Sequence, residues 1–204
     1  MISIYQLKPA FQNLLRPLVN RLATAGVTAN AVTLAAMFIS LLLGAVLLWL
    51  GARESAWFLL LPLWMFVRMA FNAVDGMLAR EHHQQSALGA YLNELSDVVS
   101  DAALYLPFCL VAPFTTLSIG AVIWCAAVSE MTGALGPMVG ASRQYQGPMG
   151  KSDRAFVFGA LGLWVGLGYA LPAWFVYLPW LLCAIMLVNM AARIKSALRQ
   201  VTHS

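Results

Sequence analysis

Long apolar stretches separated by short polar ones are the main pattern of this sequence. Stretches of about 20 apolar residues, the length that crosses a bilayer as a helix, occur six times, at about 31–50, 56–79, 88–112, 117–139, 154–171 and 174–192. Residues 4–24 differ, because apolar side chains recur there at helical spacing opposite Lys8, Arg16 and Arg21. The pattern predicts an all-α integral membrane protein with six transmembrane helices, preceded by an amphipathic helix that lies in the membrane interface.

The composition leads to the same fold class. Of the 204 residues, 61% are apolar and only 10% are charged, and the mean hydropathy is +0.78. A water-soluble domain could not hide that much apolar surface from solvent. We therefore expect a single membrane domain over residues 1–204.

The basic residues predict which ends of the spans face the cytoplasm. They concentrate before the first apolar stretch, at the end of the second, after the fourth and after the sixth, whereas the loops at the opposite ends carry only Arg53. By the positive-inside bias, both termini, the interfacial helix and the 81–87 and 140–153 loops are cytoplasmic. We expect an inner (cytoplasmic) membrane protein whose net charge of +4 serves orientation and contact with anionic lipids, with no nucleic acid as partner.

Five of the eight acidic residues fall inside predicted spans, namely Asp75, Glu94, Asp97, Asp101 and Glu130. Each would cost about 2.5–3.5 kcal/mol at the centre of a membrane helix without compensation. We therefore expect these carboxylates to face a cavity, a metal ion or a partner of opposite charge.

Two neighbouring spans carry their polar and small residues on one face. In the second span these are Asn72, Asp75, Gly76, Ala79 and Arg80, and in the third they recur every four positions at Gly89, Asn93, Asp97 and Asp101. The short loop between the spans predicts an antiparallel hairpin, in which residues whose numbers sum to about 169 share a depth. Asp75 then lies level with Asn93 and Glu94, and Asn72 lies level with Asp97. Oxygen ligands around such a space suit Mg²⁺ or Mn²⁺ holding a phosphate, and nothing there suits zinc.

Farther from the loop, the same register places Arg68 level with Asp101. The simplest interpretation is a buried structural ion pair, with Glu130 on the fourth span as a rival partner for Arg68. For the shallower residues the alternative to a metal site is a polar seam that only packs the two helices together.

These residues resemble the signature of the CDP-alcohol phosphotransferases, also called CDP-alcohol phosphatidyltransferases. The family pattern AspGly-x2-AlaArg-x8-Gly-x7-Asp is matched here by Asp75-Gly76, Ala79-Arg80, Gly89 and Asp97. The family pattern contains two further aspartates, and this chain has Asn72 and Asn93 at those positions. Six of the eight signature positions therefore match at the correct spacing.

The resemblance implies a role for each matching position. Asp75 corresponds to a metal-ligating aspartate, and Asn72 and Asn93 stand where the family has further metal ligands. Asp97 corresponds to the last aspartate, which lies near the metals and is the proposed catalytic base on the attacking alcohol.

The remaining signature positions correspond to the nucleotide site of the family. Gly76, Ala79 and Gly89 match small residues against which the cytidine nucleotide lies, and Arg80 matches an arginine near its phosphates. The implied reaction is divalent-metal-dependent (Mg²⁺ or Mn²⁺, one or two ions) transfer of a phosphatidyl group from CDP-diacylglycerol to a small alcohol, with release of CMP, in phospholipid synthesis. The resemblance also implies a homodimer with its active site at the cytoplasmic leaflet.

The acceptor alcohol is less well defined by the sequence. Arg143, Lys151 and Arg154 lie in or beside a loop that could fold over the site and bind an acceptor phosphate, which weakly favours glycerol 3-phosphate. The alternative for these three residues is ordinary positive-inside flanking of membrane helices.

The two asparagines are the departure from the family pattern. The four signature positions hold two negative charges where the family has four, so we expect a single tightly held metal, two metals with Glu94 or the substrate diphosphate supplying charge, or lost catalysis. A working enzyme is favoured because Asp75, Arg80 and Asp97 are retained. The alternatives are a non-catalytic lipid- or nucleotide-binding relative and a cation-coupled transporter.

Overall fold

The computed structural model describes the backbone of residues 4–202 and the side chains of residues 10–202. This part of the chain forms helices and turns, without strands. The long helices are α1 (Ile4–Thr24), α2 (Ala29–Trp49), α3 (Leu60–Glu81), α4 (Ala87–Tyr105), α5 (Thr116–Ala134), α6 (Lys151–Gly166) and α7 (Leu178–Thr202). Short 3₁₀ turns lie between them at Ser55–Leu59 (η1), Leu106–Leu110 (η2), Gly136–Val139 (η3) and Ala173–Tyr177 (η4).

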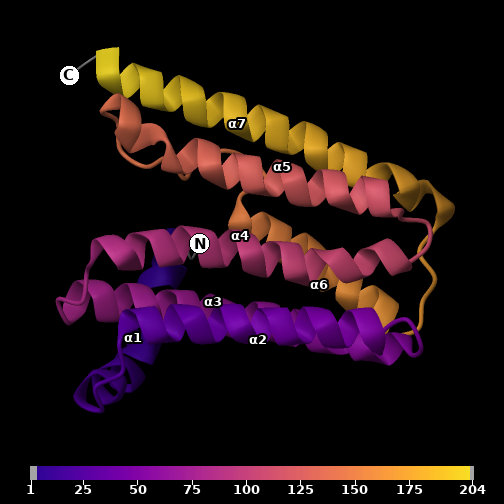
Figure 1. Ribbon diagram of the computed structural model, residues 1–204, viewed down its shortest axis with the longest axis horizontal. Helices are drawn as coiled ribbons and strands as arrows, with labels where there is room; N and C mark the ends of the chain where they lie inside the picture. The colour runs from indigo at the N-terminus through magenta and orange to yellow at the C-terminus, as the bar shows by residue number, and fades with distance from the viewer. Residues whose placement is uncertain (1–3, 203–204) are drawn as a thin grey trace.

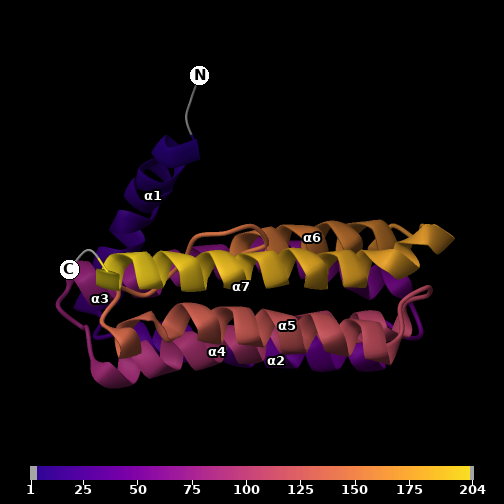
Figure 2. The ribbon, with the colours of Figure 1, turned by 90° about the horizontal axis from the view of Figure 1, so that it is seen from above.

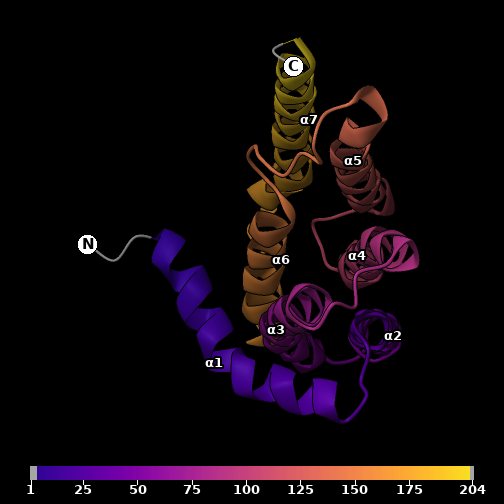
Figure 3. The same ribbon diagram turned by 90° about the vertical axis from the view of Figure 1, so that its left-hand side faces the viewer.

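Helices α2 to α7 run along a common axis, and α1 leaves the bundle at one end (Figures 1 and 2). Seen end-on, α2, α3 and α4 form a triangle, α6 lies against α3, and α5 and α7 form a pair beyond α4 (Figure 3). The close packing partners agree with this view: α2 packs against both α3 and α4, α4 against α5, α5 against α7, and α6 against α3 and η1. The predicted α3–α4 hairpin is thus held together largely through α2.

Side-chain caps define where several helices begin. The Thr28 hydroxyl accepts a hydrogen bond from the Ala31 amide (3.2 Å) at the start of α2, and Ser86 accepts one from the Gly89 amide (2.9 Å) at the start of α4. Such caps satisfy amides that have no partner inside the helix. At α6 the Asp153 carboxylate accepts from the Gly150 amide (3.1 Å), so this helix starts at Lys151, three residues before the predicted position 154.

Helix α7 also extends farther than the apolar pattern predicts. The apolar stretch ends near residue 192, yet the helix continues to Thr202. The added turns are amphipathic: Arg193 and Ala197 are buried against the bundle, whereas Ile194 and Leu198 are exposed. A hydropathy pattern identifies apolar, lipid-facing segments. It therefore does not identify the amphipathic turns by which α7 continues past its apolar stretch.

Aromatic and aliphatic side chains from several helices form the main core. Tyr105 stacks on Phe158 with ring centroids 3.8 Å apart, and Phe58 and Phe108 meet edge to face. A second cluster joins α1 to α2 and α3 through Val19, Val32, Val74, Met77 and Leu78. This second cluster fixes α1 at the end of α3 that carries the signature residues.

Four helical segments are long and apolar enough to cross a membrane: Ala29–Trp49, Ser55–Glu81, Thr116–Ala134 and Ala173–Thr202. The apolar surface of the bundle, with exposed residues such as Phe38, Leu42, Trp124 and Leu187, fits an integral membrane protein. The other two predicted spans differ for physical reasons: α4 carries three acidic residues, and α6 is only 16 residues long.

Candidate active site

Asp75 lies near the end of α3 and is supported by α2. Its side chain is buried, with only 7% of the residue exposed. Thr33 donates a hydrogen bond from Oγ1 to Asp75 Oδ2 at 2.8 Å. Because a carboxylate can accept several hydrogen bonds or metal ligations, this single side-chain donor fixes the orientation of Asp75 and leaves acceptor capacity free.

Gly76 and Arg80 follow Asp75 on the same face of α3. A Cβ atom on Gly76 would lie 3.0 Å from one guanidinium nitrogen of Arg80, so the Arg80 side chain folds back over this glycine. Arg80 itself is exposed and forms no ion pair with the residues that the structure describes. Its charge is therefore available at the surface of the site.

On α4, Gly89 and Asn93 face the same region. A Cβ atom on Gly89 would lie 2.8 Å from Asn30 Oδ1, so this glycine permits α2 and α4 to approach closely. Asn93 is exposed and Asn72 is partly buried. Within the described residues, neither side-chain amide forms a hydrogen bond, which leaves both amide oxygens available to a ligand.

Asp97 on α4 is held by two cations. Lys151 Nζ lies 2.5 Å from Asp97 Oδ1, and an Arg68 guanidinium nitrogen lies 3.2 Å from the same oxygen. Lys151 and Asp97 are also the charged groups near enough to Asp75 to act on it electrostatically. We call Asn72, Asp75, Asn93 and Asp97 the signature cluster; Lys151 forms an ion pair with its Asp97 carboxylate.

A second group of charges, the ion-pair network, lies farther from the 82–86 loop and consists of Arg68, Asp101, Glu130, Arg154 and Arg193. Arg68 pairs with Asp101 at 2.6 Å, as the depth register predicted. Arg154 bridges Asp101 and Glu130, at 3.0 Å from each. Glu130, the rival partner for Arg68, instead pairs with Arg154 and, at 3.6 Å, with Arg193.

Arg143 lies at the rim of the site, in the loop between α5 and α6. It forms a short ion pair with Glu94 and a longer one, at 3.4 Å, with Glu130, and its guanidinium lies 4.1 Å from the ring centroid of Tyr145. Partial burial alone would lower the pKa of Arg143, but the hydrogen bond and charge of Glu94 outweigh it and raise the pKa above its ordinary value. Arg143 therefore stays charged.

The 140–153 loop folds onto the acidic helices, and its three basic residues reach different depths. The Gln144 amide donates to the Gly133 carbonyl (3.0 Å), and the Asn189 side chain donates to the Pro148 carbonyl (2.6 Å), which tie the loop to α5 and α7. Lys151 reaches the signature cluster and Arg143 reaches its rim. Arg154 is 1% exposed and belongs to the ion-pair network, so its guanidinium is not accessible to an acceptor phosphate in this structure.

Comparison with known proteins supports one family. A sequence model described as CDP-alcohol phosphatidyltransferase matches residues 26–188, a range that includes the whole signature cluster and Lys151. The chain belongs to the CDP-alcohol phosphatidyltransferase family. Membership implies a transferase of phospholipid synthesis.

Two curated proteins are similar to this chain in sequence. The chain is 46% identical over 189 residues to the inner membrane protein YnbA of Escherichia coli (strain K12), which covers 92% of each chain. It is 36% identical over 103 residues to an uncharacterized protein of Aquifex aeolicus (strain VF5), covering 50% of this chain and 48% of that protein.

The fold of this CDP-alcohol phosphatidyltransferase is similar to that of the Mycobacterium tuberculosis phosphatidylinositol phosphate synthase PgsA1. The crystal structure of that protein with CDP-DAG bound matches with a TM-score of 0.71 and 20% identity, covering 89% of this chain and 92% of the other. Its structure in complex with manganese and citrate matches with a TM-score of 0.67 and 19% identity, covering 89% and 87%.

The oxygen donors of the signature cluster determine which metal ion it can hold. Among the described residues, no three His, Cys, Asp or Glu side chains are grouped as a metal site. The oxygens of Asp75, Asn72 and Asn93 nevertheless suit a hard cation such as Mg²⁺ or Mn²⁺. Asp97 fits less well because Lys151 and Arg68 already neutralise it. The residues therefore fit one such ion.

Sequence reasoning missed the contribution of α2 to the site of this transferase. Asn30 lies beside Gly89, and Thr33 bonds Asp75. Ser40 accepts a hydrogen bond from Trp64 Nε1 at 2.9 Å. A signal was present: these polar residues of an otherwise apolar helix share one face, at spacings of three and seven.

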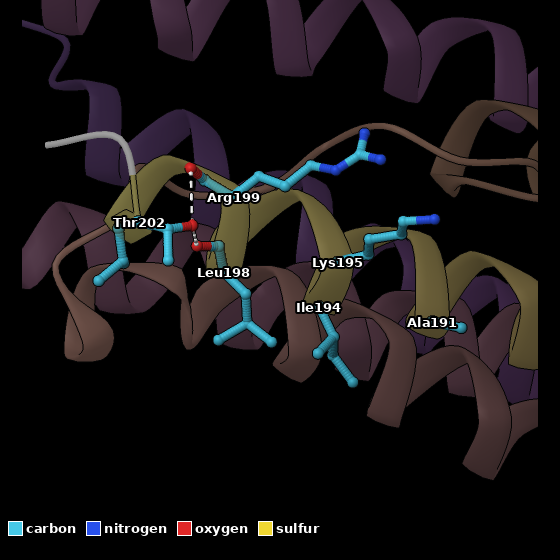
Figure 4. A pocket seen from close by; sticks show the side chains of 7 residues that line it. Ala191, Ile194, Lys195, Leu198, Arg199 and Thr202 are labelled. Carbon is cyan, nitrogen blue, oxygen red and sulfur yellow. Dashed lines mark hydrogen bonds between the residues drawn. The ribbon is translucent and has the colours of Figure 1, made fainter.

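A separate apolar hollow lies along the C-terminal turns of α7, with a volume of about 790 Å³ (Figure 4). Ile194 and Leu198 project to one side of the helix there, and Lys195 and Arg199 to the other. None of the signature residues lines it, so we do not place the reaction of this transferase there.

Proposed function

We propose that this transferase moves the phosphatidyl group of CDP-diacylglycerol to a small alcohol and releases CMP. The observation that carries the proposal is the signature cluster itself: Asp75 and Asp97 stand at the family spacing, and Arg80 follows Asp75 on α3. The solved relative with CDP-DAG bound supports the choice of donor.

Asp75, with the amide oxygens of Asn72 and Asn93, would hold the divalent cation. When bound, such an ion neutralises charge on the diphosphate and makes the phosphorus more electrophilic. The residues themselves supply the orientation: Thr33 fixes Asp75, and α2 holds α3 and α4 at a constant separation.

The nucleotide half of the donor would lie against Gly76, Ala79 and Gly89. The Asn30 side chain lies beside Gly89 in this structure and would move aside. Arg80 would leave its position over Gly76 and bind the phosphates. This arrangement is supported by the exposure of Arg80 and by its lack of an ion-pair partner within the described residues.

Asp97 would act as the base. In this role it accepts the hydroxyl proton of the acceptor while the acceptor oxygen attacks phosphorus and the bond to the CMP oxygen breaks. Lys151 and Arg68 hold the carboxylate in a fixed orientation before the acceptor arrives. Lys151 has a flexible stem and 28% side-chain exposure, so it can withdraw from Asp97 without movement of the helix.

The acceptor is a small alcohol, and glycerol 3-phosphate is the phosphorylated candidate. Of the three basic residues proposed for its phosphate, Arg143 is best placed, because its side chain is 18% exposed and its partner Glu94 is 28% exposed. A phosphate can replace Glu94 at Arg143. Lys151 reaches Asp97 instead, and Arg154 is buried in the ion-pair network.

The same proposal includes the membrane arrangement. Six spans, α2 to α7, would cross the inner membrane with both termini and the signature cluster on the cytoplasmic side, and the protein would act as a homodimer. The parallel course of α4 and α6 with the four apolar segments supports six spans.

A non-catalytic lipid- or nucleotide-binding role is the second candidate, and two observations favour it. The Lys151–Asp97 ion pair occupies the position of the proposed base, and two signature aspartates are asparagine. Turnover would exclude this role.

The test is CMP release by the purified full-length chain in detergent or lipid, with CDP-diacylglycerol, Mn²⁺ or Mg²⁺, and a panel of acceptors that includes glycerol and glycerol 3-phosphate. We expect CMP release that Asp97→Ala abolishes and that Glu54→Ala, an exposed acidic residue in the opposite loop, leaves unchanged. Absence of CMP release with every acceptor would refute the proposed activity.

A further inference from the structure

Lys151 places a positive charge at one carboxylate of the signature cluster. It is the first residue of α6, and its ammonium lies 2.5 Å from Asp97 Oδ1. An ammonium is a compact, strongly hydrated point charge. In this site a side chain therefore already supplies positive charge at Asp97.

The position of Lys151 is fixed by the helix that carries it. Asp153 accepts from the Gly150 amide and closes the first turn of α6. Arg154, in the same turn, is anchored to Asp101 and Glu130 and is fully buried. The backbone of Lys151 therefore cannot retreat from α4 without breaking the ion-pair network, and its charge stays near the cluster even when the side chain moves.

A divalent cation at Asp97 would meet two repulsive neighbours. Lys151 and Arg68 both contact Asp97 Oδ1. Further carboxylates in the cluster would offset this repulsion, but its other two members are the uncharged amides Asn72 and Asn93. Asp75 differs, because among the described residues the one side chain that bonds it is Thr33, through an uncharged hydroxyl. The structure thus separates the two carboxylates into one paired with cations and one open to a cation.

We propose that each chain binds a single divalent cation, at Asp75, and that the Lys151 ammonium supplies at Asp97 the positive charge that a second metal ion would otherwise bring. The inference rests on the proposed function, because it concerns the same site. It makes Lys151 a positioning residue that sets how many ions the site takes.

The experiment counts Mn²⁺ bound per chain, by elemental analysis after equilibrium dialysis and by electron paramagnetic resonance, on the full-length protein. We expect one Mn²⁺ per wild-type chain without a spin-coupled pair. Lys151→Gln should tighten Mn²⁺ binding by about tenfold or more, because a neighbouring positive charge is removed. Lys151→Arg should keep the wild-type count, and Lys195→Gln, on the exposed end of α7, should change nothing.

A combined variant makes the count itself change. Asn72→Asp, Asn93→Asp and Lys151→Gln together restore the carboxylates and remove the ammonium, so we expect two Mn²⁺ per chain and a spin-coupled signal. Two Mn²⁺ ions in the wild-type chain, no bound Mn²⁺ at all, or equal Mn²⁺ affinity in wild type and Lys151→Gln would each overturn the inference.

Assays of CMP release on the same preparations separate this inference from the proposed function. Two bound Mn²⁺ with CMP release would refute the inference and leave the proposed function intact. One bound Mn²⁺ with the expected Lys151→Gln effect, but without CMP release, would refute the proposed function and leave the inference on the number of metal ions intact.

Discussion

The signature cluster and the ion-pair network both include polar residues of α3 and α4, yet they differ in how their charges are satisfied. In the network, Arg68, Asp101, Glu130 and Arg154 are all buried, and each lies within 3.0 Å of an opposite charge. In the cluster, two amides and Asp75 have no charged side chain bonded to them within the described residues. A buried charge that is fully paired serves the fold, whereas polar groups left without partners are free to bind a ligand.

The difference also explains why the cluster needs helper residues from other elements. Asp75 depends on Thr33 of α2, and Asp97 depends on Lys151 of α6. The network, in contrast, connects α3, α4, α5, α6 and α7 directly. We therefore expect substitutions in the two regions to separate function from stability.

The largest effect is expected from Asp75→Asn. Loss of the one carboxylate open to a cation should lower CMP release by about a thousandfold, equivalent to about 4 kcal/mol of transition-state stabilisation. The melting temperature should hardly change, because an amide oxygen can still accept from Thr33. The rate of CMP release and the thermal unfolding of the same preparation test the two expectations, with Glu54→Gln as the exposed control. Unfolding of the variant would show that Asp75 belongs with the network.

Arg154→Met should have the opposite profile. It leaves Asp101 and Glu130 buried with fewer partners, and breaking a buried ion pair from one side costs about 3–5 kcal/mol of folding free energy. Thermal unfolding in detergent measures the loss, and Arg199→Met, an exposed arginine of α7, is the matched control. A variant as stable as wild type but without CMP release would place Arg154 in the active site instead.

Thr33→Val should weaken the cluster without dismantling it. Groups that orient a metal ligand are typically worth about 10–100-fold in metal affinity, so Mn²⁺ binding should weaken by that factor. Thr132→Val is a suitable control, because Thr132 also lies on a helix and bonds only the carbonyl four residues before it. If both variants bind Mn²⁺ as wild type does, Thr33 is a packing residue.

The smallest effect is expected from Arg16→Gln. Arg16 pairs with Glu81 across α1 and α3, but both side chains are well exposed, at 45% and 34%. Exposed pairs contribute little to stability because water already solvates their charges. The melting temperature should equal that of wild type within error, and a loss approaching that of Arg154→Met would show that α1 is fixed by this pair and not by the Val19 cluster.

The sequence carried enough information for the elements that obey local rules. The apolar pattern located every long helix, and equal rise along two antiparallel helices was sufficient to pair Arg68 with Asp101. Errors at the ends of helices had local causes as well. The early start of α6 follows from the Asp153 cap, and the late end of α7 follows from its amphipathic final turns.

Contacts between distant segments were beyond the sequence rules. Lys151 meets Asp97 across 54 positions, and Thr33 meets Asp75 across 42, so no helical period relates either pair. Loop residues such as Arg143 can follow many paths from their flanking helices, and hydropathy does not choose among them. The structure provided these contacts, which are the ones that distinguish an open carboxylate from a neutralised one.

The Arg68–Asp101 pair has a consequence for the way the chain enters the membrane. Because of its acidic residues, helix α4 is not apolar enough to insert by itself. Helix α3 carries the buried Arg68. If α3 and α4 enter the bilayer together as a hairpin, Arg68 and Asp101 can form their ion pair before either side chain reaches the hydrocarbon. We therefore expect the insertion machinery to retain α3 until α4 has been synthesised and to release both segments into lipid together.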